Sequence, residues 1–126
     1  MNILLDVLSP AKPAKMDHIA TRYPTCTLDI ASFLHRLSAH PGPLPGVLHY
    51  SAPEPYTKYE MVLVMASILG VDHSHVTPVR EEDEVPGAGV QRPRDCRLSV
   101  RCLEEIGMEV SARGFEEYWR EALARK

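Results

Sequence analysis

The chain has 126 residues, of which 44% are hydrophobic and 25% are charged, and its formal net charge is -3. That length suits one domain at most, and that composition is typical of a soluble globular protein. The small negative charge gives no long-range attraction for nucleic acid or for an anionic membrane, so we expect neither as a partner. No apolar run reaches the length of a helix that could span a bilayer.

The cysteines and the N-terminal segment bear on the cellular compartment. Cys26, Cys96 and Cys102 have no CxxC spacing, and any disulfide pairing leaves one of them over. Reduced thiols fit the cytoplasm or the nucleus. Segment 2–8 is apolar but has no basic residues before it and contains Asp6, so it does not predict a signal peptide. We expect a cytoplasmic protein, with a nuclear location left open.

The N-terminal third predicts two elements: one that is either a strand or the end of a helix, and one helix. Segment 2–8 is compatible with a strand or with the end of a helix. An element so near the terminus is unusual, and one interpretation is a chain cut from something longer. A helix is expected from about Thr27 to His40, with Thr27 or Asp29 as its N-cap. Four apolar residues would share one side of that helix: Ile30, Phe33, Leu34 and Leu37.

The strongest helix signal lies at residues 57–70. Thr57 and Glu60 have the spacing of a capping box, and Gly70 stands where a left-handed glycine ends a helix. The apolar residues between them cover more than one face, so this helix needs neighbours on two sides: Met61, Val62, Val64, Met65, Ile68 and Leu69. Just before it, segment 47–51 is apolar apart from His49 and predicts a strand inside a sheet.

Three further elements are expected towards the C-terminus: a turn and a strand within 71–79, a helix over 100–106, and a helix beyond Ser111. Ser99 is the expected cap of the first of these helices, and Gly107 its end. On the last helix, Phe115, Trp119 and Leu123 recur at four-residue spacing, which is typical of core anchors.

Motifs for catalysis, cofactors or metals are weak or missing. His73 and His75 have no third ligand near them, so we favour a polar turn capped by Asp72 over a metal site. None of the seven glycines makes a glycine-rich turn between a strand and a helix, so the chain has no dinucleotide fingerprint or P-loop. No tyrosine has a lysine four residues later, the spacing of the proton-relay pair of short-chain reductases. We therefore expect no catalytic, cofactor or metal site in these residues.

Two arginines, Arg92 and Arg94, flank a rigid proline and suggest a binding site. Guanidinium groups bind phosphate or carboxylate bidentately, so one interpretation is a small anion site or a surface for an acidic partner. The other is that these arginines pair with Asp95 or with the acidic segment 81–84, itself expected to be a solvated loop. Spacing alone favours the second interpretation.

Five segments in this order resemble the C-terminal half of extended short-chain dehydrogenases of the dTDP-4-dehydrorhamnose reductase-like family. They are 22–25 (Arg-Tyr-Pro-Thr), 28–31 (Leu-Asp-Ile-Ala), 57–61 (Thr-Lys-Tyr-Glu-Met), 91–94 (Gln-Arg-Pro-Arg) and the end of a short helix at 106–107, preceded by Leu98. Within that family, segments 16–18, 56–61 and 91–94 are most similar to the branch of methionine adenosyltransferase regulatory β subunits. The resemblance runs from about residue 3 to residue 123.

The resemblance implies an α/β fold and a candidate cleft. It implies a single unit over 1–126, made of the C-terminal strands and helices of a Rossmann-type fold and a small substrate-binding lobe, without the N-terminal dinucleotide-binding half. Gln91, Arg92 and Arg94 would face the substrate cleft, and Pro24 and Thr25 would lie near its floor. NADP is the cofactor of the full-length relatives, and no site for it is expected in this chain.

The function implied is binding or regulation without catalysis, in S-adenosylmethionine biosynthesis. The partner implied is the catalytic subunit of methionine adenosyltransferase, although the aromatic-rich tail with which the regulatory subunits dock has no counterpart in a chain ending at Lys126. One alternative is a fragment of an NADP-dependent sugar-nucleotide reductase, and another is an isolated small-molecule-binding lobe. Apolar faces that lack neighbours also predict self-association.

Overall fold

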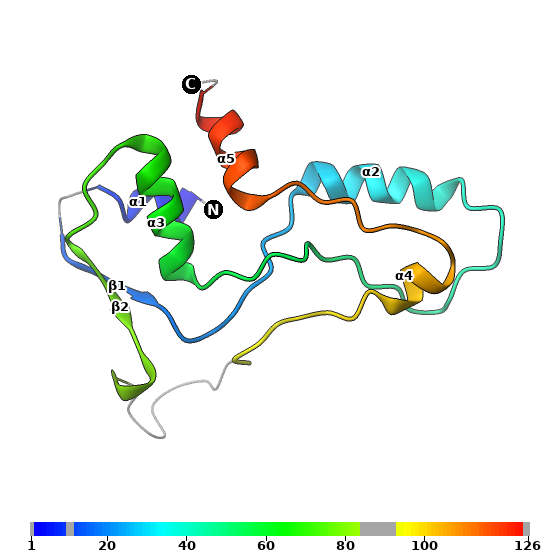
Figure 1. Cartoon of the computed structure of the whole chain (residues 1–126), viewed down its shortest axis with the longest axis horizontal. Coiled ribbons are helices and arrows are strands. Elements are labelled where there is room, and N and C mark those ends of the chain that lie inside the picture. Colours follow the sequence, from blue (N-terminus) through cyan, green and yellow to red (C-terminus); the bar gives the residue numbers. More distant parts are fainter. Residues whose placement is uncertain (1, 10–11, 84–92, 125–126) are drawn as a thin grey trace.

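The computed structural model describes residues 2–9, 12–83 and 93–124. The described elements are α1 (Asn2–Asp6), β1 (Ala14–Asp17), α2 (Thr27–Ser38), α3 (Lys58–Leu69), β2 (Val76–Val79), the 3-10 helix η1 (Glu81–Asp83), α4 (Arg101–Glu105) and α5 (Phe115–Ala124). The molecule is elongated, with α1, α3, α5 and the strands at one end and α2 and α4 at the other (Figure 1). Irregular segments run between the two ends.

The described strands form a small parallel sheet. β1 pairs with β2 in a register that runs from Ala14 opposite Val76 to Asp17 opposite Val79. Parallel strands need a long connection, and here α2 and α3 lie within it. This arrangement confirms the predicted α/β class, and Val76–Val79 confirms the strand expected within 71–79.

Helix α3 has the ends that the sequence predicts. The Thr57 hydroxyl accepts a hydrogen bond from the Glu60 amide at 3.2 Å, and the Glu60 carboxylate accepts one from the Thr57 amide at 2.7 Å. This reciprocal pair satisfies two donors that a helix start leaves unpaired. Gly70 ends the helix in the left-handed region with φ 64°.

Helix α3 is also the centre of the first apolar cluster. Buried side chains from α1, α3, β2, α5 and the turn after α1 meet there: Leu4, Leu8, Met61, Val62, Met65, Ala66, Val76 and Phe115. Val62 and Met65 are completely buried, so the helix has neighbours on more than one side, as predicted. Leu69 departs from the prediction, since 43% of its surface is exposed.

The second apolar cluster lies at the other end, between α2 and α4. Its buried residues are Phe33, Leu103 and Met108. Phe33 stacks on Tyr50 with a centroid distance of 4.5 Å. Gly107 ends α4 with φ 72°, as predicted. The prediction of the last helix is confirmed by α5, whose Phe115 is buried.

The predicted strand at 47–51 is wrong. The segment has no regular structure, and Val47 is 68% exposed. Leu48 and Tyr50 nevertheless pack against the second cluster. These two residues of segment 47–51 therefore pack against α2 and do not belong to a sheet.

Two predicted N-caps are wrong as well. Cys26 is the N-cap residue of α2 and Val100 that of α4, and neither makes a capping side-chain bond, so Thr27, Asp29 and Ser99 do not cap. Asp29 instead binds the segment before α5, as described below. Leu34 was expected on the buried side of α2 and is 55% exposed. For segment 2–8, the helical alternative is the correct one.

No helix in the described ranges is long and apolar enough to cross a membrane. All three cysteines are free thiols.

Candidate functional site

The segment that joins β1 to α2 passes through the middle of the molecule and holds three parts of the chain together. Arg22 and Tyr56 exchange backbone hydrogen bonds of 2.7 and 2.9 Å. On the neighbouring residue, the Thr21 amide donates to the Arg94 carbonyl at 2.7 Å, and the Thr21 carbonyl accepts from the Cys96 amide at 3.2 Å. Residues that follow this junction form the wall of a cavity.

The cavity has a volume of about 210 Å³ and lies between the start of α2 and helix α5. One wall is a continuous stretch of chain, and the other is an arginine followed by aromatic residues. The lining residues are Pro24, Thr25, Cys26, Thr27, Arg113, Phe115, Tyr118 and Trp119. The walls thus combine apolar rings with one guanidinium group.

Thr25 holds its wall in place through its hydroxyl group. The hydroxyl donates to the Tyr23 carbonyl at 3.1 Å and accepts from the Ala52 amide at 3.0 Å. Ala52 is buried, so this bond satisfies an amide that water does not reach. Thr25 therefore positions the cavity wall.

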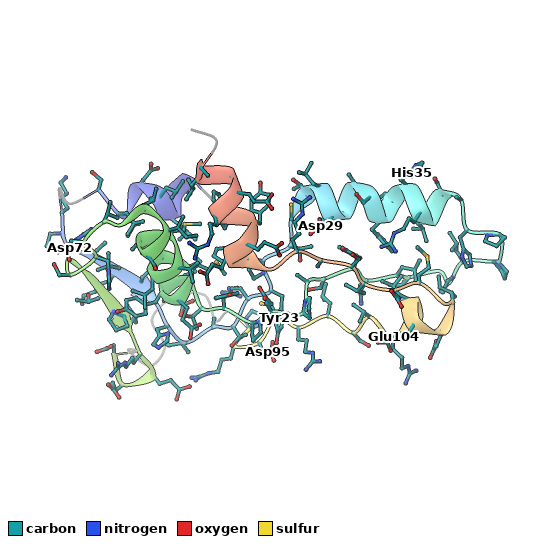
Figure 2. The ribbon with its side chains drawn as sticks, turned by 45° about the horizontal axis from the view of Figure 1, so that its top comes forward. Tyr23, Asp29, His35, Asp72, Asp95 and Glu104 are labelled. Atoms are coloured by element: carbon teal, nitrogen blue, oxygen red, sulfur yellow. The ribbon has the colours of Figure 1, made fainter. Side chains whose placement is uncertain are left out.

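Arg113 is held by two carboxylates. The buried carboxylate of Asp29 accepts from the Arg113 amide at 2.9 Å and lies 3.5 Å from its Nε atom. The Glu121 carboxylate lies 3.6 Å from the Nη1 atom. Figure 2 shows Asp29 at the start of α2, facing the chain that leads to α5. The two acidic groups more than offset the guanidinium charge, so an anionic ligand gains little from Arg113 alone.

The aromatic side of the cavity is part of the first cluster. Phe115 lies 4.9 Å from Tyr56 and 6.3 Å from Trp119 between ring centroids, and Trp119 meets Tyr118 edge-on at 5.4 Å. The Phe115 amide donates to the Glu54 carboxylate at 2.8 Å, which fixes the start of α5. The prediction that Phe115 and Trp119 are core anchors is confirmed.

The predicted site residues fall into two groups. Pro24 and Thr25 line the cavity. Arg94 is absent from that lining and pairs with Glu81 of η1. This ion pair fits the interpretation in which Arg94 meets the acidic segment, and a substrate-facing role for it stays a prediction. Gln91 and Arg92 lie outside the described residues.

Asp95 and Tyr23 form a small polar group beside the junction, where Figure 2 shows them adjacent. Loss of hydration and the Asp95 carboxylate raise the pKa of Tyr23 above its ordinary value of 10.0. The Asp95 carboxylate also accepts from the Arg97 amide at 2.8 Å. Tyr23 is therefore a neutral hydrogen-bond donor at physiological pH.

The histidine pair forms the polar turn that we favoured. The Asp72 carboxylate accepts from the Ser74 amide at 3.2 Å and from the Ser74 hydroxyl at 2.6 Å, and these bonds lower the pKa of Asp72. A ring nitrogen of His75 lies 2.8 Å from the Val7 carbonyl oxygen. Across the described part of the chain, no three His, Cys, Asp or Glu residues are grouped to hold a metal ion.

Nothing in the sequence pointed to Arg113, to Asp29 as its partner, or to Cys26 and Tyr118 as cavity-lining residues. Asp29 and Arg113 are 84 positions apart, so no local spacing could reveal their contact. The one available signal was the acidic residue near the start of a helix, which pointed to capping. Long-range pairs of this kind become visible only once the fold brings the segments together.

The whole chain, residues 1–126, matches the family model of the RmlD substrate binding domain. The chain belongs to the RmlD substrate-binding domain family. The predicted family is therefore confirmed, and the cavity and junction described above are features of a member of it.

Curated relatives of this RmlD-family chain include β subunits of methionine adenosyltransferase 2. It is 34% identical over 116 residues to methionine adenosyltransferase 2 subunit beta of Danio rerio. The aligned region covers 90% of this chain and 35% of that protein. It is also 34% identical over 100 residues to the subunit of the same name of Bos taurus, covering 77% of this chain and 29% of that protein. The chain thus spans about a third of the length of these relatives.

Solved structures agree on the fold. A dTDP-4-dehydrorhamnose reductase from Clostridium acetobutylicum matches with a TM-score of 0.76 at 20% identity, over 99% of this chain and 43% of that one. The reductase of Bacillus anthracis, solved in complex with NADP, matches with a TM-score of 0.77 at 18% identity, over 99% of this chain and 42% of that one. The chain therefore has a partial Rossmann-type fold, as predicted, equivalent to less than half of these enzymes.

Proposed function

We propose that this chain is a non-catalytic binding protein of the methionine adenosyltransferase β-subunit type, acting in S-adenosylmethionine biosynthesis. The observation that carries the proposal is the 34% identity that extends over 116 residues and 90% of the chain. The reductase structures are 20% identical or less and support the fold alone. The partner of this function is the catalytic subunit of methionine adenosyltransferase.

The cavity beside Pro24 and Thr25 supports contact with a protein partner better than turnover of a substrate. The cavity beside Pro24 and Thr25 is smaller than the usual range of small-molecule sites, about 300–1,000 Å³. Its guanidinium group is engaged by Asp29 and Glu121. It can hold one small apolar or aromatic group.

The end of the molecule around α2 offers apolar surface to such a partner. Five large apolar side chains of α2 and of the irregular segments 40–50 and 93–100 are exposed: Leu28, Leu34, Leu44, Val47 and Leu98. Exposed apolar side chains of this size are typical of surfaces that contact another protein when they gather in one region. We propose this end as the docking surface.

The remaining site assignments are part of the same proposal. Gln91, Arg92 and Arg94 face an anionic ligand in the family's cleft, near Pro24 and Thr25, and the chain itself has no NADP site. The order and spacing of these residues in the sequence support the anion site. The lack of an NADP site is supported by the sequence, which has no glycine-rich turn between a strand and a helix.

An assay of S-adenosylmethionine formation tests the proposal. The full chain is added to a methionine adenosyltransferase catalytic subunit, and the rate is followed as the ratio of the two proteins rises. We expect a saturable change in rate that reaches its plateau near a fixed ratio, because a regulatory subunit acts by forming a complex. A Leu34→Ser, Val47→Ser variant should require more protein for the same change, and the exposed Lys12→Ala variant should match the wild type.

The competing function is a role in an NADP-dependent sugar-nucleotide reductase. Oxidation of NADPH by the chain in the presence of a dTDP-4-keto sugar, with no effect on S-adenosylmethionine formation, would replace the proposal with that function. An unchanged rate in both assays would leave the isolated binding lobe as the function.

A further inference from the structure

The edge of β1 that faces away from β2, which no described strand covers, carries a further inference. The Ala14 amide donates to the His75 carbonyl, and the His18 amide donates to the Val79 carbonyl, both at 3.0 Å, so these residues use their backbone groups on β2. Backbone groups alternate sides along a strand, so the N–H and C=O groups of Lys15 and Asp17 point away from β2. The sheet of the described residues has two strands, so no other described strand covers this edge.

The outer edge of β2, in contrast, cannot readily pair with another strand. Pro78 lies opposite Met16 in the register and, by the same alternation, on the side of β2 away from β1. Proline has no N–H group, and its ring obstructs a neighbouring strand. A strand can therefore be added to this sheet at β1.

A two-stranded sheet has a physical reason to gain strands. A two-stranded sheet depends for its stability on further strands or on a helix packed against it, so an added strand would strengthen this sheet beyond what α3 supplies. Met16 packs against the first cluster while Lys15 is exposed, so the sheet has one covered face to extend. Unpaired edges with free N–H and C=O groups recruit strands from other chains.

We propose that β1 pairs with β1 of a second copy of this chain, in antiparallel register centred on Met16. In that register Lys15 lies opposite Asp17 of the second copy, and Asp17 lies opposite Lys15 of the second copy. Both pairs are hydrogen-bonded pairs, because Lys15 and Asp17 are the residues whose backbone groups point outward. The result is one continuous four-stranded sheet with a two-fold axis.

The charges of the edge select this partner and this register. Lys15 and Asp17 lie on the same face of β1, so the antiparallel register brings opposite charges together at both pairs. The Asp17 carboxylate is already oriented, since it accepts from the Ile19 and Ala20 amides at 2.9 and 3.1 Å. The Arg22 guanidinium lies 3.9 Å from the Asp17 carboxylate, and the Asp17 side chain is still 30% exposed. A shift of one residue would lose both the outward backbone pairing and the charge pairing.

Sedimentation equilibrium of the full chain at rising concentration tests the pairing. We expect the average mass to climb from that of one 14.1 kDa chain towards that of two. Lys15→Pro removes an outward N–H group without touching the bonds to β2, and should raise the dissociation constant by more than about 10-fold. Lys15→Ala removes two charge pairs and should raise it by about 2- to 30-fold. Lys12→Ala, an exposed lysine outside the strand, is the matched control and should have no effect.

If circular dichroism shows that Lys15→Pro does not fold, Lys15→Glu decides instead, since it keeps the backbone and places like charges opposite each other in both pairs. A wild-type chain that stays monomeric at every concentration would overturn the proposal. So would a dimer that is indifferent to Lys15→Glu and Lys15→Pro. A monomer whose Lys15 variants lose binding to the methionine adenosyltransferase catalytic subunit would assign the edge to that protein and likewise overturn the self-pairing.

Cross-linking tests the register. In a variant with Cys26, Cys96 and Cys102 replaced by serine, Met16→Cys should form a disulfide between the copies on oxidation. The register makes the two residues 16 a pair without hydrogen bonds, whose Cα atoms lie about 4.5 Å apart, within disulfide reach. Efficient cross-linking by Lys15→Cys instead would show a different register and contradict the assignment.

Discussion

At the scale of single residues, Thr25 before α2 and Asp29 within α2 each hold a distant segment in place. Thr25 fixes the cavity wall through Ala52, and Asp29 fixes the start of α5 through Arg113. Both bonds link segments far apart in the chain. Their partners are backbone amides, which are costly to bury unpaired.

Loss of the α3 capping box is the first prediction. Thr57→Ala removes the hydroxyl that accepts from the Glu60 amide and lies 2.9 Å from Nδ1 of His18. We expect a loss of about 1–2 kcal/mol in the free energy of unfolding, measured by urea denaturation. Thr27→Ala is the matched control, since Thr27 is exposed at the start of α2 and makes no cap; an equal loss in both variants would contradict the role of the box.

The second prediction concerns Arg92, which lies outside the described residues. We expect Arg92→Ala to abolish any weak binding of dTDP measured by titration calorimetry, because a guanidinium fork contacts phosphate bidentately. The far-ultraviolet circular dichroism should not change. Arg97→Ala is the matched control, and dTDP binding that survives in the Arg92 variant would refute the cleft assignment.

At the scale of elements, the described residues form two apolar clusters that share no buried residue. The first surrounds α3, and the second lies between α2 and α4. Met65 and Leu103 are completely buried at their centres. The irregular segments of the junction connect the two clusters (Figure 1).

This division gives the third prediction. Leu103→Ala should cost about 2–5 kcal/mol, as should Met65→Ala, because each leaves a cavity in a packed cluster. In hydrogen exchange, Leu103→Ala should lower protection in α2 and α4 and leave α3 protected, since separate clusters open separately. Leu34→Ala, at a position that is 55% exposed, should change neither quantity. Equal deprotection of α3 and α2 in the Leu103 variant would show that the chain unfolds as one unit.

The sequence predicted those elements whose signals are local. The capping box and Gly70 fixed both ends of α3, and the spacing of Phe115 and Trp119 identified α5. It failed where distant partners decide the outcome. The pattern of segment 47–51 predicts a strand, but the segment stays outside the sheet and its Tyr50 stacks on Phe33 of α2. Pro24 and Thr25 line the cavity, and their place in a substrate cleft stays a prediction from resemblance. The polar wall of the cavity depends on the contact between Asp29 and Arg113, which are 84 positions apart.

At the scale of the whole molecule, much of the apolar surface has no cover within the described residues. Ile3 is 76% exposed and Val47 is 68% exposed. Burial of such a side chain is worth about 1.5–3 kcal/mol, and a few of them are comparable with the whole stability of a small domain. We therefore predict that association adds to the stability of this chain.

The fourth prediction is a melting temperature that is low for the chain alone and rises with protein concentration. Association stabilises the folded state by mass action, so the transition in a calorimetric scan should move upward as the sample is concentrated. A sharp transition well above physiological temperature, independent of concentration, would show that the chain is stable without partners.

The most direct test of the central claim is a calorimetric titration of this chain into the methionine adenosyltransferase catalytic subunit, beside a titration with NADPH. We predict saturable binding to the catalytic subunit, weakened by Leu34→Ser with Val47→Ser, and negligible binding of NADPH. Absence of binding to the catalytic subunit, together with a micromolar site for NADPH, would contradict the account.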